Sequence, residues 1–324
     1  MKEQLSINKN KIKGLFDLKI TINSGQTSQP AWRCNGNYYH NLLIIDNQPV
    51  LIELTQNEFL GSLEVIIESN KKININSVIN EIKRIFDLEF ALTTFYEFLA
   101  SDKQLKPAVD FCKGLRLFKA HNLFECLISS ICSANNSIIR WNRSINLIRE
   151  KWGQKEHFSE GTFFTFPHPQ KILHVPEHEV EEMEMCSGEK NIEECINNLK
   201  SCGVGYRGKF MKRVAQMVTE EIDLDKIGRM NYDQAFEKLL EFPGVGPKVA
   251  DCILLYGYGM GQAFPTDIWI KRIISHLYFD DKDINVSKIR DFGREKFGDY
   301  AGYAQLYLFH YARKSGLLDK LKPK

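Results

Sequence analysis

The pattern of hydrophobic and polar positions changes once along the chain. The first 75 residues contain short runs rich in β-branched and aromatic residues, separated by Asn, Gln and Gly. These runs, Tyr38–Ile45, Pro49–Leu54 and Leu63–Glu68, are typical of strands. From Asn76 onward apolar residues recur at the spacing of a helix, and the pattern continues through Leu88–Leu99. The chain therefore begins with strands and continues with helices.

This change of period predicts an α+β protein. We expect an antiparallel, β-rich N-terminal domain with flanking helices over residues 1–100, followed by a mostly α-helical region over residues 101–324. The length agrees with this division, because a domain takes roughly 150 residues. Neither repeats nor low-complexity tracts interrupt the two regions.

Charge is nearly balanced, with 43 Lys and Arg against 41 Asp and Glu, a formal net charge of +2. The sum argues against a strongly basic nucleic-acid-binding protein but leaves open a basic face. Segment 177–194 holds eight glutamates and one lysine, and we interpret it as a solvated helix face. Basic residues gather at 207–213 and at the C-terminus.

The eight cysteines do not form a C-x2-C pair, and the last 72 residues contain none. This spacing argues against a disulfide framework and against a four-cysteine zinc or iron–sulfur site.

A run of 18 apolar residues is absent, so we expect no membrane-spanning helix. The first 14 residues do not resemble a signal peptide. We expect a cytoplasmic protein with reduced thiols, associated with the nucleoid if the source is prokaryotic.

A glycine-rich turn near residue 245 is the most informative motif. A helix is predicted over 233–242, Pro243–Gly246 ends it, and Pro247 suits the first position of a second helix. The two glycines allow a tight turn whose N–H groups point outward, beside the positive end of a helix dipole. We interpret 233–258 as a helix-hairpin-helix that binds DNA phosphates through Gly244, Val245 and Gly246. The alternative is a simple turn between packed helices.

Lys248 and Asp267 are the candidate catalytic pair. Lys248 lies in the first turn of the second helix, where the dipole disfavours its protonated form, and a lysine with a lowered pKa suits nucleophilic catalysis. Asp267 directly precedes another helical pattern, so its structural role would be that of an N-cap. A capping carboxylate is held rigidly, and this role is compatible with catalysis beside the lysine.

The sequence PGVGPKVADCILLYG, followed by AFPTDIWIKRI, resembles the helix-hairpin-helix (HhH-GPD) DNA glycosylase superfamily. Lys248 makes it similar to the bifunctional glycosylase/lyase branch. Three further stretches, at 124–141, 202–210 and 299–313, resemble 8-oxoguanine DNA glycosylases. The resemblance implies a TBP-like N-terminal domain and a monomeric DNA repair enzyme that acts on double-stranded DNA. It further implies that no cofactor and no iron–sulfur cluster are required, and it suggests a monovalent cation on the hairpin carbonyls.

The resemblance also implies roles for individual residues. Lys248 would attack C1′ of the damaged nucleotide and form a Schiff base, and Asp267 would stabilise the developing sugar cation. The strand would then be nicked by β-elimination. The flipped base would stack on Phe309 and be closed in by three further residues. These are Gln305 at its Watson–Crick edge, Cys252 on its other face and the Gly25 carbonyl at N7, which carries a proton only in the oxidised purine. Core packing is the alternative role for Phe309 and Cys252.

A second group would contact the strand opposite the lesion. By resemblance, Asn135, Arg140 and Arg207 would hold the estranged cytosine, and Tyr206 would wedge into the vacated stack. The alternatives are a helix boundary at Asn135 and a nonspecific phosphate contact by Arg207. The sequence departs from the family at residues 26–33, where an aromatic-basic-Trp run is common, and at Trp269, where some relatives carry histidine.

Two other functions fit parts of the sequence. A glycosylase of the same superfamily could act on another lesion, such as an alkylated base or an oxidised pyrimidine. The iron–sulfur branch lacks its ligands here, and alkylpurine relatives usually lack the lysine. A helix-hairpin-helix protein without catalysis would bind DNA equally well. It would have no need of a lysine–aspartate pair.

Overall fold

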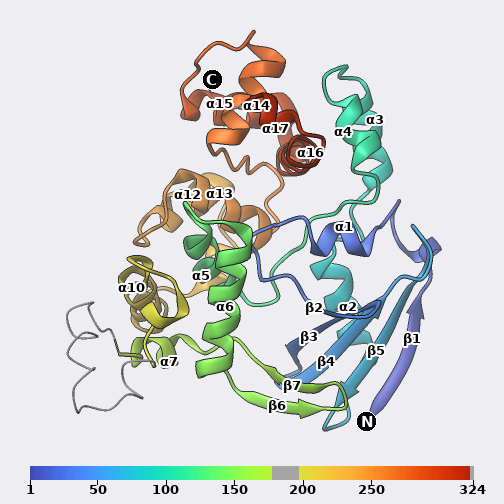
Figure 1. Cartoon of the computed structure of the whole chain (residues 1–324), viewed down its shortest axis with the longest axis vertical. Coiled ribbons are helices and arrows are strands. Elements are labelled where there is room, and N and C mark those ends of the chain that lie inside the picture. The colour runs from blue at the N-terminus through green and yellow to red at the C-terminus, as the bar shows by residue number, and fades with distance from the viewer. Residues whose placement is uncertain (177–196, 322–324) are drawn as a thin grey trace.

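A computed structural model describes residues 1–176 and 197–321 of the chain (Figure 1). The acidic segment 177–194, interpreted above as a helix face, lies outside these residues. The described part has an N-terminal antiparallel sheet followed by a mostly helical region, which confirms the α+β prediction. Among the described residues, no helix is both long and apolar enough to cross a membrane.

The N-terminal sheet has five strands in the order β1-β5-β4-β3-β2, all paired antiparallel. The three central strands confirm the predicted ones within a residue at each end. The edge strands β1 and β2 were not predicted, because β1 is largely exposed and β2 has only three residues. The strands are β1 (Lys2–Ile7), β2 (Arg33–Asn35), β3 (Tyr38–Ile45), β4 (Gln48–Thr55) and β5 (Leu63–Ser69).

Helices cover one face of this sheet. Buried residues of α1 (Leu18–Ile22) and α2 (Ile75–Ile85) join alternate residues of β4 and β5 in one hydrophobic cluster. Alternation along a strand directs every second side chain to this face, and α2 presents its apolar stripe to it. The helical pattern predicted through residue 99 is present but is divided between two helices. Helix α2 ends at Ile85, Asp87 has a φ of 51°, and α3 (Leu92–Ala100) begins only at Leu92.

The opposite face of the sheet meets a small hairpin made of β6 (Lys155–Phe158) and β7 (Gly161–Phe164). Phe163 packs there against Leu42 and Leu51, which are direct partners on β3 and β4. Figure 1 shows the hairpin crossing below the sheet, directly after the long helix α6 (Ile138–Trp152). The two strands are short and polar, so the hydrophobic pattern did not predict them.

The helical region has one continuous core, to which α5, α13 and α16 contribute most of their length. Single-turn 3-10 helices occur at Lys9–Lys11, Lys200–Cys202 and Gly298–Tyr300. The first helices of the region are α3 (Leu92–Ala100), α4 (Lys106–Phe111), α5 (Leu123–Ser133), α6 (Ile138–Trp152) and α7 (Pro169–Leu173). Those after the undescribed segment are α10 (Arg207–Glu220), α11 (Leu224–Ile227), α12 (Tyr232–Leu240), α13 (Pro247–Tyr256), α14 (Ile268–Tyr278), α15 (Val286–Phe297), α16 (Ala301–Lys314) and α17 (Leu317–Lys320).

Candidate active site

The predicted hairpin lies between α12 and α13. Gly244 has a φ of 84°, and a Cβ atom there would lie 2.8 Å from Phe210 Cδ2, so the turn requires glycine. Val245 is buried and anchors the turn, whereas Gly246 is exposed and forms the N-cap of α13. Pro247 occupies the first turn, as predicted. The positive end of the α13 dipole and its unpaired first-turn N–H groups therefore face solvent, where an anion could bind.

Lys248 is the second residue of α13 and is half-buried. Its helix is fixed from behind by a buried ion pair. The carboxylate of Asp251 is fully buried and accepts hydrogen bonds from Arg290 Nε on α15, at 2.6 Å, and from the Tyr232 hydroxyl on α12. Because a buried charge is tolerated only when it is paired, this network holds three helices in one arrangement. This network therefore fixes the backbone of α13 at Lys248.

Asp267 is the N-cap of α14, as the sequence predicted. Its Oδ1 atom accepts hydrogen bonds from the N–H groups of Trp269 and Ile270, both at 2.9 Å. The cap satisfies two N–H groups that would otherwise lack a partner, and it fixes the side chain. Its carboxylate is near enough to Lys248 to favour the protonated amine.

The prediction of a lowered pKa for Lys248 is wrong for the free protein. Burial is the largest single influence and does lower the pKa. The Cys252 sulfur, which hydrogen-bonds the amine, and the Asp267 carboxylate outweigh burial, so the net effect raises the pKa of Lys248. A helix dipole of about half a charge is weaker than these direct neighbours. The amine is therefore protonated at neutral pH and must lose a proton before it can attack.

One cavity of about 130 Å³ is lined by all of the residues predicted to form the base pocket. Lys248 and Cys252 lie on one face of α13, Asp267 closes one side, and Gln305 and Phe309 come from α16. Gln305 is buried, and its Oε1 atom has no hydrogen-bond partner within residues 1–176 and 197–321. An unsatisfied buried acceptor is costly, and it is the kind of group that a bound ligand satisfies. Gly25 completes the set, as a lining residue from the N-terminal loop.

The loop that carries Gly25 is buried although its sequence departs from the family pattern. Gln26 donates a hydrogen bond to the Arg116 carbonyl at 2.9 Å and accepts one from the Phe118 N–H at 2.8 Å. Arg313 on α16 donates to the Ser24 carbonyl at 2.7 Å. These bonds attach the loop to two distant segments, so Gly25 is held at the pocket by contacts other than the usual aromatic residues.

Arg313 contacts two residues of the pocket, Ser24 and Phe309, and the sequence analysis missed this role because it counted Arg313 only among the C-terminal basic residues. It follows Phe309 by one helical turn, and its guanidinium carbon lies 5.6 Å from the centre of the Phe309 ring. Burial lowers its pKa. The spacing of four residues after a pocket aromatic was the available signal. The lining residues of the pocket that were not predicted are Ser24, Gln26, Thr27, Ser133, Asn136, Ile138, Trp141, Tyr256, Pro265 and Leu306.

The residues predicted to contact the opposite strand lie beside this cavity. Arg207 donates from Nε to the Ala134 carbonyl at 3.1 Å and from Nη2 to the Asn135 carbonyl at 3.3 Å. Tyr206 is 60% exposed, and its ring lies 4.6 Å from the Arg207 guanidinium carbon. Asn135 has a φ of 49°, a left-handed conformation that asparagine tolerates. Arg140 is exposed in the first turn of α6.

Comparisons with known proteins agree with this geometry. Residues 5–127 match the family described as 8-oxoguanine DNA glycosylase, N-terminal domain. Residues 128–298 match the HhH-GPD superfamily of base excision DNA repair proteins. A probable N-glycosylase/DNA lyase of Methanothermobacter thermautotrophicus is 44% identical over 309 residues, which cover 95% of this chain and 97% of that protein.

Solved structures show the same similarity. One is the Clostridium acetobutylicum 8-oxoguanine glycosylase/lyase, bound to double-stranded DNA with cytosine opposite 8-oxoguanine. It is 31% identical with a TM-score of 0.76, and the match covers 98% of both chains. The 3-methyladenine DNA glycosylase of Archaeoglobus fulgidus has a TM-score of 0.74 at 19% identity, covering 96% of this chain and 99% of that one. This second likeness is one of fold alone.

Fold and site thus define a helix-hairpin-helix DNA glycosylase with a lysine in its pocket. More narrowly, the chain belongs to the 8-oxoguanine DNA glycosylase/lyase family of the HhH-GPD superfamily. It is a bifunctional enzyme of base excision DNA repair that combines glycosylase and lyase activities.

Proposed function

We propose that the enzyme excises 8-oxoguanine opposite cytosine through an imine on Lys248 and then nicks the strand by β-elimination. One observation carries the proposal. Lys248, Asp267 and the four predicted pocket residues come from widely separated segments, yet they line a single cavity. A DNA-binding hairpin without catalysis would not require this convergence.

The chemistry follows from the two charged groups. The deprotonated Nζ of Lys248 forms a bond to C1′, and the C1′–N9 bond breaks, so the base leaves with the electron pair and takes up a proton. The carboxylate of Asp267 stabilises the positive charge that develops on the sugar. Opening of the sugar ring yields the imine, which acidifies the C2′–H. Loss of that proton forms a C2′–C3′ double bond and expels the 3′ phosphate.

Four groups would recognise the flipped base. Phe309 provides a stacking surface, and the unsatisfied Oε1 of Gln305 accepts a hydrogen bond from the Watson–Crick edge. The Gly25 carbonyl would accept the N7 proton that only the oxidised purine carries. Normal guanine presents a lone pair at N7, so the same carbonyl would repel it. Cys252, whose thiol pKa is raised by burial, would lie against the other face of the base.

Gly25→Ala should lose excision of 8-oxoguanine while keeping cleavage of a preformed abasic site. An added Cβ would lie 2.5 Å from Ile138 Cδ1 and 2.8 Å from Arg313 Nη1, and alanine is strained at the φ of 87° that Gly25 adopts, so we expect the loop and its carbonyl to shift along with these two side chains. An abasic site has no base to recognise, so its cleavage does not need this carbonyl. The measurement compares single-turnover rates on the two substrates.

Gly36→Ala is the matched control for this variant. Gly36 has a φ of 60°, so alanine is strained there too, but a Cβ would meet nothing within 4 Å. The control should cleave both substrates at wild-type rates. Equal loss on both substrates in Gly25→Ala would contradict the role of the Gly25 carbonyl.

The proposed cytosine contacts lie on one surface beside the pocket. Exposed Tyr206 would fill the gap left by the flipped base, and exposed Arg140 would donate to the acceptors of cytosine. Arg207 holds the carbonyls of Ala134 and Asn135 in the free protein. It therefore supports the loop that presents Asn135, and it can reach cytosine only by releasing one of these bonds.

Arg140→Gln should reduce the preference for cytosine by roughly 10- to 100-fold, since a good bidentate contact discriminates by about 1–3 kcal/mol. The assay uses duplexes with 8-oxoguanine opposite each of the four bases. Arg143→Gln is the control, because it removes an equally exposed arginine one turn further along α6. If wild-type protein excises the lesion equally opposite all four bases, the proposed cytosine clamp is wrong.

The DNA backbone would be held by the hairpin of Gly244, Val245 and Gly246, with phosphate at the N-terminus of α13. The pocket is complete within one chain, so we propose that the enzyme acts as a monomer.

Duplexes with an alkylated base or an oxidised pyrimidine test the alternative lesions. Faster excision of any of these than of 8-oxoguanine would overturn the proposed substrate.

A further inference from the structure

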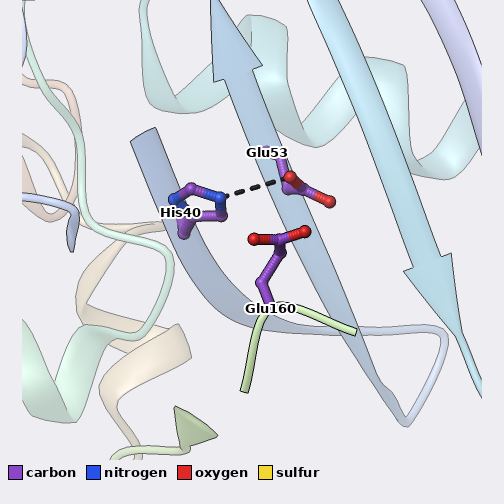
Figure 2. A group of neighbouring side chains, drawn as sticks. All are labelled: His40, Glu53 and Glu160. Atoms are coloured by element: carbon purple, nitrogen blue, oxygen red, sulfur yellow. Dashed lines mark hydrogen bonds and ion pairs between the residues drawn. The ribbon is translucent and has the colours of Figure 1, made fainter. Parts of the chain in front are cut away.

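A polar cluster lies under the β6–β7 hairpin, on the face of the sheet that the hairpin covers. His40 on β3 and Glu53 on β4 are direct cross-strand partners, and Glu160 comes from the turn between β6 and β7. One ligand atom from each of the three lies within 4.8 Å of the others. Figure 2 shows the imidazole and both carboxylates converging on one point. None of the three lines the base pocket.

Two of the three side chains are buried. His40 and Glu53 are each 3% exposed, and within the described ranges the Lys2 ammonium is the one charged partner of Glu53 Oε1. Its ion pair with Lys2, at 3.1 Å, involves a side chain that is 43% exposed. A buried carboxylate is costly unless it is fully paired, so this site favours a further cation.

The charges around Lys2 also do not balance. Its ammonium lies 3.1 Å from Glu53, 3.8 Å from Glu160 and 4.0 Å from Glu68. One ammonium thus faces three carboxylates, which leaves two negative charges uncompensated when His40 is neutral. A divalent cation carries the charge that would neutralise this excess.

The hydrogen bonds of His40 fix the direction of its lone pair. Nδ1 lies 3.3 Å from the Arg33 carbonyl, which can only accept, so the ring proton is assigned to Nδ1. In the neutral ring Nε2 then carries a lone pair, and it faces Glu53 Oε2 at 3.2 Å. Two lone pairs at this distance repel each other, so either a proton on Nε2 or a metal ion lies between them. A histidine whose second nitrogen donates to a backbone carbonyl is the usual arrangement of a metal ligand.

From this cluster we propose a structural site for a divalent transition-metal ion of the Zn²⁺ or Mn²⁺ class. Ligands about 2.0–2.2 Å from a tetrahedral ion are separated by roughly 3.4 Å, close to the His40–Glu53 distance. An imidazole with two carboxylates suits this class better than Mg²⁺ or Ca²⁺. Glu160 is only 34% exposed in its side chain but sits on a turn, so it can close on the ion. The ion would fasten the hairpin to the sheet.

Metal binding to the full-length, chelator-treated protein tests the site. We expect one Zn²⁺ per chain by calorimetric titration, one Mn²⁺ by electron paramagnetic resonance, and a higher melting temperature with either ion. Mn²⁺ is included because it does not favour thiolates, which rules out binding at cysteine. Mg²⁺ should leave the melting temperature unchanged. Excision of 8-oxoguanine should be the same with and without the ion, since the base pocket is elsewhere.

Variants separate a metal site from an ion-pair network. Glu160→Gln and His40→Gln should each weaken metal binding at least tenfold, and Glu156→Gln, on the same hairpin, should not. Glu160 is partly exposed, so its variant should fold even if His40→Gln does not. Lys2→Met should tighten metal binding, because it removes a competing cation. Absence of stoichiometric binding in the wild type, or binding that Glu160→Gln leaves unchanged, would overturn the proposal.

Discussion

Lys248→Gln should abolish the covalent adduct that we expect borohydride to trap between the wild-type enzyme and 8-oxoguanine DNA. The amide of glutamine cannot form an imine, so both excision and strand cleavage should fall by on the order of 10³-fold or more. The substitution also removes the cation beside Cys252 and Asp267, but the backbone of α13 stays fixed by the Asp251–Arg290 pair. DNA binding should therefore persist. Adduct formation is measured by gel shift after reduction, and binding by fluorescence anisotropy.

Lys288→Gln is the control, because it removes an exposed positive charge from α15, away from the pocket. Its adduct yield should equal that of the wild type.

The raised pKa of Lys248 leads to a second expectation. The single-turnover rate should increase as pH rises through neutrality, because a larger fraction of the Lys248 amine becomes deprotonated. An adduct that persists in Lys248→Gln would show that another amine is the nucleophile.

Asp267→Asn should retain the fold but lose roughly 10²- to 10³-fold in excision rate. Asparagine caps a helix about as well as aspartate, so the bonds to the N–H groups of Trp269 and Ile270 can persist. The negative charge that stabilises the sugar cation is lost, and such preorganised charge accounts for a large part of catalysis. Thermal melting and single-turnover kinetics separate the two effects.

Asp267→Ala is the comparison for this variant. Alanine removes both the cap and the charge, so it should cost about 1 kcal/mol of stability in addition to the same loss of rate. If Asp267→Asn keeps most of the wild-type rate while Asp267→Ala does not, the residue acts mainly as a cap and the proposed catalytic role is wrong.

Much of this site could be predicted because its signals are local. A turn with two glycines, a proline at the first helical position and an aspartate before an apolar helical pattern each predict a local backbone conformation, and the structure shows all three conformations. The central strands β3, β4 and β5 were also predictable, because burial on at least one face gives them a continuous or alternating apolar pattern.

The features that the sequence did not predict either lack a hydrophobic pattern or depend on contacts between distant segments, which exist only in the folded protein. Strand β1 is largely exposed and the β6–β7 hairpin is polar, so neither has a strong hydrophobic pattern. The role of Arg313 requires Ser24, which is 289 residues away. The pKa of Lys248 was predicted in the wrong direction because its direct neighbours, Cys252 and Asp267, outweigh the helix dipole.

The assembly of the base pocket has a consequence for folding kinetics. Its wall joins residues 24–27, 133–141, 248–256, 265–267 and 305–309, so nearly the whole chain must be in place before the pocket exists. Contacts between such distant segments carry a high cost in loop-closure entropy and form late. During refolding, excision activity should therefore recover after the helical far-ultraviolet signal. An intermediate with most of its helices could bind DNA through the hairpin and still leave every lesion in place.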